Sequence, residues 1–428
     1  MASEKFQVIV IGAGPAGSSA AYRLAKAGCE VLLIEKAKAA GSKSVSGGRL
    51  YSYALEELLP GEWLDAPLER EVIREMITVM TEESSISLDC RMSGMPPRQS
   101  YTVLRAKLDS WLAAKAEAAG AMFITGSKVD RLLMRNGRVS GVISGEEEIE
   151  SDIVILADGV NSMIASNAGL IAPPIAENMA VAVKHVIALP EQAINERFGL
   201  KSGQGAGLLL MGACTAGING GGFLYTNRES ISLGVVLDSK ALKKSKMQLV
   251  DIAENIKFHP SIVPLIADGE LVEYSAHLIP EGGIKKVPRL YGDGYMIAGD
   301  AAGLVINNGF TVRGMDYAII SGIAAADTAV GALEGGNCTA AALAKYKTLL
   351  QANVLRDMET FKHMHDFMVS TPDLYSTYPA ILEDIVKNIF TIDGARPARL
   401  PGILRRSIFG RVTPWKLLRD WVKGMRSV

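Results

Sequence analysis

The sequence has few cysteines, and their spacing matches no local metal motif. Cys29, Cys90, Cys214 and Cys338 are scattered over 428 residues with no C-x-x-C among them. Zinc knuckles and local iron–sulfur motifs need closely spaced cysteines. The pattern therefore excludes such motifs, offers no disulfide framework and favours a reducing compartment.

The net charge is close to zero, and we expect neither an N-terminal leader nor a catalytic cluster of side chains. Lys and Arg number 45 against 46 Asp and Glu, so we expect no nucleic-acid partner. The segment MASEKF leads directly into an apolar strand, which leaves no room for a cleaved signal and predicts cytoplasmic synthesis. His363 and His365, two residues apart in a predicted helix, face different sides and are expected at the surface. We therefore expect no metal site and no acid, base or nucleophilic catalysis by side chains.

One long uncharged stretch, residues 202–227, imitates a membrane span. It holds eight glycines together with Gln204 and Asn219. Its short apolar pieces at 207–211 and 223–225 are typical of strands joined by a glycine turn, so a span is not predicted.

The most informative motif that is present lies near the N-terminus. Val8 to Ile11 form an uninterrupted apolar run, typical of a buried parallel strand. Gly12, Gly14 and Gly17 follow with the spacing G-x-G-x-x-G, before a helical pattern. In such a turn the first glycine bends the chain, the second admits a pyrophosphate and the third lets the helix pack closely. The motif predicts a dinucleotide-binding βαβ unit with phosphates at the helix N-terminus.

The residues after this motif supply the expected context. A predicted helix from Pro15 to about Ala27 is followed by a strand at 31–34 and by Glu35, 18 residues beyond Gly17. An acid at that strand end suits the hydroxyl pair of an adenosine ribose without a 2′-phosphate. We therefore predict a bound adenine dinucleotide, and the alternative is a glycine turn of purely structural use.

Two later strands end in the same way. Residues 152–157 form an apolar strand that ends at Asp158, and 295–298 form another that ends at Gly299 and Asp300. Ligands of open α/β sheets bind at such strand ends, although a simple Asp-Gly turn would look the same locally. A helix beginning at 310–316 could face an anionic ring oxygen with its positive end. Because no second G-x-G-x-x-G unit follows, we predict one extended FAD and no NAD(P) domain.

Two other segments offer ligand contacts with open alternatives. The loop 38–48 is rich in small residues and precedes Arg49, so it either lies against a ligand or is a flexible surface loop. Arg105 begins a predicted helix that ends near Gly120, and it either contacts an anion or is solvated.

The chain length predicts more than one lobe, because a single core stops growing at about 250 to 300 residues. We predict an α/β fold in which a Rossmann-type FAD-binding domain is interleaved with an antiparallel-sheet substrate domain, plus a helical C-terminal region. The FAD-binding domain is predicted at 1–75, 101–174 and 286–335, the substrate domain at 76–100 and 175–285, and the helical region at 336–428.

The last 35 residues are strongly basic. Residues 394–428 hold nine Lys or Arg and only Asp420, so the tail carries +8 and the remainder about −9. Trp415, Leu418 and Val422 recur at i, i+3 and i+7, which predicts a helix with one apolar face. The tail could bind an anionic membrane, dock an acidic subunit, or pack on the protein body.

Three motifs together resemble a large flavoprotein superfamily. GAGPAG (12–17), LADGVNS (156–162) and YMIAGDAAG (295–303) resemble the superfamily of aromatic hydroxylases, geranylgeranyl reductases and electron-transfer-flavoprotein:quinone oxidoreductases. More specific segments resemble the last of these, in its bacterial FixC form. They are GSKSVSGGRLY (41–51), VKHVIALP (183–190), GGGFLYTN (220–227), FHPSI (258–262), AHLIPEGG (276–283) and INNGFTVRGMDYAIISG (306–322).

The resemblance implies which residues bind FAD. The glycine turn would hold the pyrophosphate, Glu35 the adenosine ribose, and Asp300 the ribityl chain or pyrophosphate. The implied cofactor-binding set is Gly12, Gly14, Pro15, Ala16, Gly17, Glu35, Lys36, Gly47, Gly48, Arg49, Arg105, Val129, Asp158, Gly159, Gly299, Asp300 and Gly309. The implied flavin-adjacent set is Gly309, Thr311 and Gly314 at the flavin O2 edge, with Phe223, Gly282 and Gly283 on the quinone side.

The resemblance also implies a function. It implies an oxidoreductase that passes electrons from a two-subunit electron-transfer flavoprotein to a membrane quinone, at the inner face of the cell membrane. Eukaryotic-type relatives carry a four-cysteine cluster domain at the C-terminus, whereas here Cys338 is the last cysteine, so a separate ferredoxin-like iron–sulfur subunit is implied. The alternatives are an FAD-dependent reductase of isoprenoid double bonds, a flavin monooxygenase, or a subunit that binds FAD only structurally.

Overall fold

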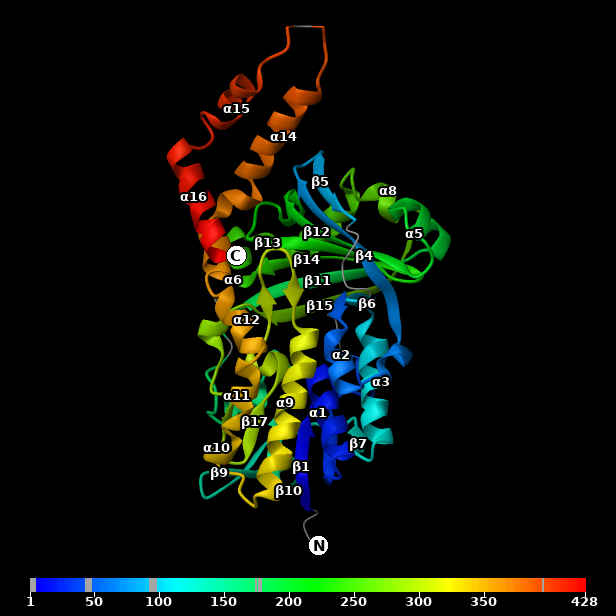
Figure 1. The fold of residues 1–428 in the computed structure, drawn as a ribbon, viewed down its shortest axis with the longest axis vertical. Coiled ribbons are helices and arrows are strands. Elements are labelled where there is room, and N and C mark those ends of the chain that lie inside the picture. Colours follow the sequence, from blue (N-terminus) through cyan, green and yellow to red (C-terminus); the bar gives the residue numbers. More distant parts are fainter. Residues whose placement is uncertain (1–4, 43–47, 92–97, 174, 176–178, 395) are drawn as a thin grey trace.

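The computed structural model describes residues 5–42, 48–91, 98–173, 175, 179–394 and 396–428. Two large sheets follow one another along the long axis, and the C-terminal helices extend beyond the second sheet (Figure 1). This arrangement confirms the predicted α/β fold with two interleaved sheets and a helical C-terminal region.

The first sheet has the Rossmann-type order. Its parallel strands lie in the order β7-β2-β1-β10-β17. They are β7 (Met122–Thr125), β2 (Val31–Glu35), β1 (Lys5–Ile11), β10 (Glu147–Leu156) and β17 (Tyr295–Ile297). The antiparallel strands β8 (Arg131–Arg135), β9 (Arg138–Ser144) and β16 (Tyr291–Gly292) complete the sheet. Val8, Ile9 and Val10 are fully buried, as their uninterrupted apolar run predicted.

The second sheet is mixed. Its strands lie in the order β15-β11-β14-β13-β12-β4-β6-β3, and β5 pairs with β4. They are β3 (Arg49–Tyr51), β4 (Leu68–Met80), β5 (Ser85–Cys90), β6 (Ser100–Val103), β11 (Met179–Ala188), β12 (Gln204–Gly212), β13 (Gly220–Thr226), β14 (Ser230–Asp238) and β15 (Glu270–Pro280). Most neighbours are antiparallel, but β4 and β12 are parallel. The uncharged stretch 202–227 supplies β12 and β13 of this sheet.

The second sheet begins earlier in the chain than the predicted boundaries. Strand β3 and the first half of β4 fall in the segment 1–75, which we assigned to the FAD-binding domain, but both pair within the second sheet. The alternation of apolar and polar residues along a strand shows that one of its faces is buried. It does not show which sheet the strand joins. The parallel β4–β12 pair arises because these strands come from two separate passes of the chain, with the Rossmann segment between them.

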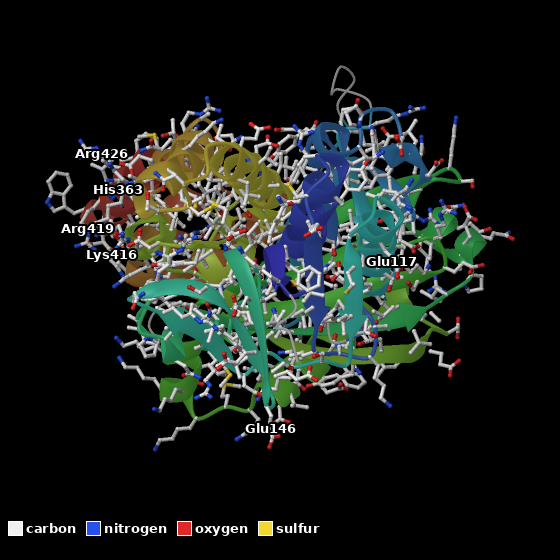
Figure 2. All side chains as sticks on the ribbon, turned by 90° about the horizontal axis from the view of Figure 1, so that it is seen from below. Glu117, Glu146, His363, Lys416, Arg419 and Arg426 are labelled. Atoms are coloured by element: carbon white, nitrogen blue, oxygen red, sulfur yellow. The ribbon has the colours of Figure 1, made fainter. Side chains whose placement is uncertain are left out.

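Helices cover the first sheet and form the C-terminal region. Helix α1 (Pro15–Lys26) contacts both α3 (Arg105–Ala118) and α9 (Met315–Glu334). The other helices are α2 (Tyr53–Leu58), α4 (Met163–Asn167), α5 (Glu191–Phe198), α6 (Ser239–Ser245), α7 (Leu249–Asn255), α8 (Val263–Ile266), α10 (Ala340–Leu343), α11 (Lys345–Gln351), α12 (Val354–Thr360), α13 (Met364–Ser370), α14 (Thr377–Phe390), α15 (Leu400–Ile408) and α16 (Pro414–Ser427). His363 is exposed, on the same side of the molecule as the tail residues Lys416, Arg419 and Arg426 (Figure 2).

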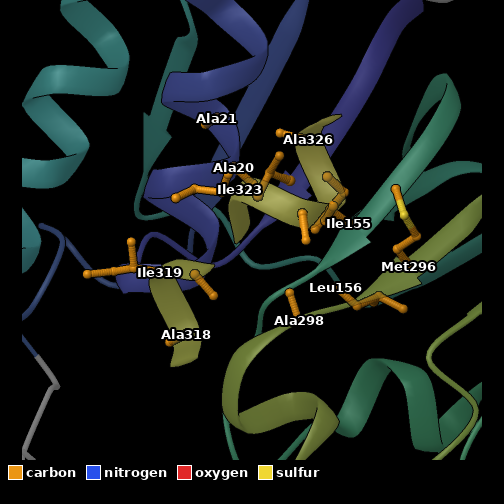
Figure 3. Packing of buried hydrophobic residues seen from close by; sticks show 14 of the residues in the cluster. Ala20, Ala21, Ile155, Leu156, Met296, Ala298, Ala318, Ile319, Ile323 and Ala326 are labelled. Carbon is orange, nitrogen blue, oxygen red and sulfur yellow. The ribbon is translucent and has the colours of Figure 1, made fainter. Parts of the chain in front are cut away.

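Helix α9 is a core helix. It has the length and composition of a membrane span, but 78% of its most apolar window is buried inside the protein. Gly322 allows α9 to approach α1 so closely that a Cβ there would overlap the Ala16 carbonyl oxygen. Alanines of both helices and isoleucines of α9, among them Ala20 and Ile323, pack together beside the strand ends (Figure 3). The glycine motif at the start of α1 and the segment that forms α9, about 300 residues apart in the sequence, therefore share one core.

Arg70 on β4 ties the second sheet together. Its side chain is fully buried, with 1% of the residue exposed. The guanidinium donates to the carbonyl oxygens of Asn227 (2.5 Å), Gln204 (2.9 Å) and Arg228 (3.0 Å), and to the side-chain oxygen of Asn195 (2.5 Å). A buried charge with this many acceptors links β4 to the β13–β14 turn and to α5.

We expect Arg70→Met to destabilise the protein by about 3 kcal/mol or more, because it leaves several buried acceptors without donors. The free energy of unfolding, measured by urea denaturation, checks this. Arg131→Met, which removes an exposed arginine from β8, is the matched control and should change stability by no more than about 0.5 kcal/mol. Equal free energies of unfolding for the two variants would contradict the role of Arg70 as the link between β4, the β13–β14 turn and α5.

Candidate functional site

A cavity of about 1080 Å³ lies where the first sheet, the second sheet and the C-terminal helices meet. Its first end is formed by the N-terminus of α1 and the carboxyl ends of β10 and β17, where ligands of open α/β sheets bind. The predicted residues that line it are Gly14, Pro15, Ala16, Gly48, Arg49, Arg105, Gly159, Phe223, Asp300, Gly309, Thr311 and Gly314. The cavity therefore brings together predicted residues from both halves of the chain.

The glycine turn leaves space in front of α1. A Cβ on Gly17 would overlap the Gly12 carbonyl oxygen, and Gly12 itself has a φ of +97°. A Cβ on Gly14, in contrast, would meet only a guanidinium nitrogen of Arg105, at 3.6 Å. The N-terminus of α1 has no side-chain cap, and Gly14, Pro15 and Ala16 line this space. The turn therefore fits an anionic group such as a pyrophosphate.

A buried ion pair holds Arg105 at this end of the cavity. Its Nε and Nη2 donate to the two carboxylate oxygens of Asp109, at 2.6 and 2.7 Å. Asp109 is fully buried and one helical turn farther along α3. The sequence analysis missed Asp109, although its i, i+4 spacing from Arg105 was a usable signal.

Asp300 and His277 share this region with Arg105. Burial raises the pKa of Asp300, and the positive charges of Arg105 and His277 oppose that rise. Burial also lowers the pKa of His277, which lies on β15 and lines the cavity. Sequence reasoning did not select His277, because nothing near it in the chain indicates that β15 reaches the strand ends of the first sheet.

Glu35 is held beside the glycine turn. Its two carboxylate oxygens accept hydrogen bonds from the backbone N–H groups of Ala13 (2.9 Å) and Ala37 (2.8 Å). This fixes an acid at the end of β2, where the sequence predicted a ribose contact.

The other predicted cofactor residues occupy different places. Lys36, Val129 and Asp158 do not line the cavity, and Val129 is part of the core. The Asp158 Oδ1 is buried, and within the described residues it has no hydrogen-bond partner. Burial raises the pKa of Asp158 to about 6. Gly299 packs against Ala16, and Gly47 lies outside the described residues.

A short hairpin forms one wall of the cavity. It joins β18 (Ile306–Asn307) to β19 (Val312–Arg313), and Gly309 within it has a φ of +82°. The Asn308 side-chain oxygen accepts from the N–H groups of Phe310 (3.0 Å) and Thr311 (2.7 Å). The hairpin is therefore a fixed turn directly before the N-terminus of α9.

Arg313 anchors this hairpin to the helices. It forms ion pairs with Asp316 (2.7 Å) and Asp357 (2.9 Å), and its guanidinium lies 4.3 Å from the centre of the Tyr317 ring. These contacts tie the hairpin to α9 and α12.

The second sheet supplies an aromatic wall. The rings of Phe223 and Tyr225 stack with their centres 5.4 Å apart, and Gly48 leaves room for Tyr225 because a Cβ there would collide with its ring. Glu281 lines the cavity, whereas Gly282 and Gly283 do not. The chain turns away at Gly283, which has a φ of +59°.

The C-terminal helices close the other end of the cavity. Helix α16 packs through Leu417, Asp420 and Gly424, and the Tyr378 hydroxyl donates to Asp420 at 2.7 Å. We predicted an apolar face made by Trp415, Leu418 and Val422. This is not the face that packs on the protein body, because Trp415 is 78% and Leu418 45% exposed. One face of α16 therefore packs on the body while the face with the tryptophan lies in solvent.

We predicted His365 at the surface, but it is half-buried. It lies on α13 and lines the cavity. This placement depends on the packing of α13 against α16 and on the hydrogen bond that Asn219 donates to the Val369 carbonyl, neither of which the spacing of the two histidines could show.

Two family models and several relatives match this chain. The FAD binding domain family matches residues 5–193, and the ETF-QO/FixC family C-terminal domain matches residues 364–428. The chain is 46% identical to "Probable electron transfer flavoprotein-quinone oxidoreductase YdiS" of Escherichia coli K12, over 100% of both chains. It is 44% identical to "Protein FixC" of the same strain, over 99% of both chains. The predicted FAD cofactor is thereby confirmed.

A solved structure shares the fold. A geranylgeranyl bacteriochlorophyll reductase-like protein from Thermoplasma acidophilum superimposes with a TM-score of 0.71 at 23% identity, covering 97% of this chain and 99% of that one. At this identity the likeness shows the fold alone.

We expect Gly14→Val to lose FAD while the protein remains folded. The backbone of Gly14 has a φ of −82°, which valine can adopt, and the added side chain would fill the space before α1. Overpacking costs about 1–3 kcal/mol, which corresponds to roughly fivefold to 150-fold weaker binding. Flavin absorbance per protein, with circular dichroism for the fold, measures both effects.

Gly331→Val is the matched control for this experiment. Gly331 lies on α9 with open space around its Cβ position, outside the cavity. The control should keep full flavin occupancy. Full occupancy in Gly14→Val as well would show that the phosphates do not lie at this turn.

Proposed function

The chain belongs to the ETF-QO/FixC family of FAD-dependent oxidoreductases, and from this we propose that it passes electrons from an electron-transfer flavoprotein to a membrane quinone. The observation that carries the proposal is the single continuous cavity. It begins at the glycine turn beside Arg105 and continues between the aromatic wall of the second sheet and the C-terminal helices. Such a space accommodates an extended cofactor and an apolar second ligand side by side.

We assign the first end of the cavity to FAD. The N-terminus of α1 and Arg105 would hold the pyrophosphate, Glu35 the adenosine ribose, and Asp300 the ribityl chain or pyrophosphate. The flavin supplies the electron-transfer chemistry, and the hairpin with Gly309 would lie at its O2 edge, before the positive N-terminus of α9. Phe223 would face the quinone from the second sheet.

We propose that a separate ferredoxin-like subunit supplies the iron–sulfur cluster. The four cysteines of this chain lie on different elements: Cys29 follows α1, Cys90 ends β5, Cys214 lies after β12 and Cys338 follows α9. Cys214 and Cys338 are buried. This dispersal supports a cluster that is brought by a partner.

We expect the purified chain to contain one noncovalent FAD and no iron or acid-labile sulfide. A reduced two-subunit flavoprotein donor should then reduce its flavin efficiently only after the small iron–sulfur subunit is added. Metal analysis and stopped-flow absorbance check the two statements. A stoichiometric cluster on the single chain would contradict this assignment, and a flavin that no partner reduces would favour a purely structural cofactor.

We further propose that the C-terminal helices bring the enzyme to the membrane surface. Helices α14, α15 and α16 extend beyond the second sheet (Figure 1). Large apolar side chains are exposed along them, namely Phe390, Ile392, Leu400, Phe409, Trp415, Leu418, Trp421 and Met425. Exposed basic residues of the same segment are Arg396, Arg399, Arg405, Arg406, Arg411, Arg419, Lys423 and Arg426. Apolar and basic residues together suit an anionic lipid surface, and a quinone is dissolved in the membrane.

We expect the double variant Arg405→Glu/Arg406→Glu to bind anionic vesicles at least about tenfold more weakly, because each basic residue near such a surface contributes roughly 1 kcal/mol. Point variants are preferable to truncation, since α16 is part of the cavity wall. Vesicle sedimentation at increasing anionic-lipid content and increasing salt measures the binding.

The double variant Lys345→Glu/Lys347→Glu is the matched control. It makes the same charge change on α11, whose exposed lysines lie near the opposite end of the molecule (Figure 1). Equal binding by both double variants would contradict the membrane assignment. If the arginine variant binds vesicles normally but no longer binds the iron–sulfur subunit, the basic tail is a docking site for that subunit.

A further inference from the structure

A polar cluster interrupts the wall of the cavity away from the glycine turn. Its members are Asp238 at the end of β14, Glu281 after β15, Asn307 on β18, His365 on α13 and Tyr375 after α13. They come from five separate segments of the chain. None of these five residues is among those that we assign to FAD binding.

Glu281 is linked to the hairpin that we place at the flavin edge. The Asn307 side-chain oxygen accepts a hydrogen bond from the N–H of Gly309 at 3.0 Å. That bond orients the Asn307 amide, so its N–H₂ group is the donor in the hydrogen bond with Glu281. One asparagine therefore joins the Glu281 carboxyl group to the hairpin backbone.

The surroundings of Glu281 keep a large share of it in the protonated form near neutral pH. Burial, together with the negative charge of Asp238, raises the pKa of Glu281 to about 7, and the Asn307 hydrogen bond opposes the rise. Asp238 is itself held in place, because its carboxylate accepts from the N–H of Ala241 at 2.6 Å. Burial and the charge of Glu281 raise the pKa of Tyr375, so the tyrosine hydroxyl stays protonated at neutral pH.

His365 connects the cluster to the outside. Burial lowers its pKa against the opposing charges of Asp366 and Asp238, while Lys285 lowers it further. Lys285 and Asp366 form an ion pair of 2.6 Å and are both more than half exposed. His365 thus lines the cavity while Asp366, the next residue in the chain, belongs to a solvated ion pair, and a neutral imidazole can both accept and donate a proton.

We propose that Glu281 is the proton donor to the quinone, with Asn307 and Asp238 as positioning residues and His365 as the link to solvent. This rests on the proposed function. Reduction of a quinone to a quinol adds two electrons and two protons, and the electrons come from the flavoprotein donor by way of FAD. In each proton transfer, the O–H bond of the Glu281 carboxylic acid breaks and an O–H bond forms on a quinone oxygen. The carboxylate left behind takes a proton from water through His365, so two such cycles supply both protons.

The test compares Glu281→Gln with wild type, using FAD-loaded protein that has first been reduced. A short-chain quinone, which takes up protons, and ferricyanide, which takes up only electrons, serve as alternative oxidants. We expect the variant to reduce the quinone at least about tenfold more slowly, since a positioned acid contributes roughly a hundredfold or more. Ferricyanide reduction should be unchanged. The wild-type quinone rate should fall as the pH rises through about 7, and the variant should lack this step.

A second readout follows the carboxyl group itself. Infrared spectra recorded during a pH titration of the oxidised protein should show a carboxylic acid C=O band that disappears near pH 7 and is missing in Glu281→Gln. Glu281→Asp should restore part of the quinone rate. Glu270→Gln, an exposed acid on β15, is the matched control and should keep both the band and the rate.

The possible failures are distinguishable. A Glu281→Gln variant that reduces the quinone as fast as wild type overturns the proposal, as does an equal loss with ferricyanide or a wild type without the titrating band. A reduced wild type that gives electrons to ferricyanide but to no quinone would instead overturn the proposed function, and the role of Glu281 with it.

Discussion

The close approach of α1 to the glycine turn and to α9 is the constraint on which the rest of the structure depends. A side chain at Gly17 would overlap the Gly12 carbonyl oxygen, and one at Gly322 would overlap that of Ala16. Since these positions carry no Cβ, the N-terminal helix and the helix beginning at Met315 share one core. That packing sets the first strand beside the strand ends at Ala157 and Asp300, and it leaves the uncapped end of α1 facing an open space. The cofactor end of the cavity is thus a consequence of helix packing.

The cavity separates two kinds of electrostatic environment. At the first end, a buried carboxylate holds Arg105 beside a helix N-terminus, which favours an anionic ligand. At the other end, the buried Asp238 lies near the half-buried Glu281, and removal from water favours the neutral form of Glu281. The aromatic side chains of the second sheet lie in the same wall. An anionic cofactor and a neutral, proton-accepting partner can therefore occupy one cavity without competing for the same contacts.

Much of the fold and the first half of the site could be predicted, because their signals are local. The spacing of Gly12, Gly14 and Gly17, the apolar run before them and the acid at Glu35 all lie within one βαβ unit. The missed residues have no such local signal. His277 and Glu281 lie on or after an edge strand of the second sheet, and they reach the cavity only because that sheet meets the strand ends of the first. Periodicity predicts which side of a strand is buried and does not predict what lies against it.

The sequence by itself determined the types of the elements, the Rossmann order of the first sheet, the FAD cofactor and, through its specific segments, the family. Each of these was inferred from short segments, and within each segment the residues are close together in the chain, where steric and hydrogen-bonding preferences act directly. Only the tertiary structure decided that β3 and β4 join the second sheet, that α16 packs through Leu417 and Gly424 rather than through Trp415, and that His365 lines a cavity. These outcomes depend on which part of the chain, distant in sequence, covers a given face of a helix or strand. The hydrophobic effect that drives such burial is non-directional, so neighbouring residues do not specify the covering segment.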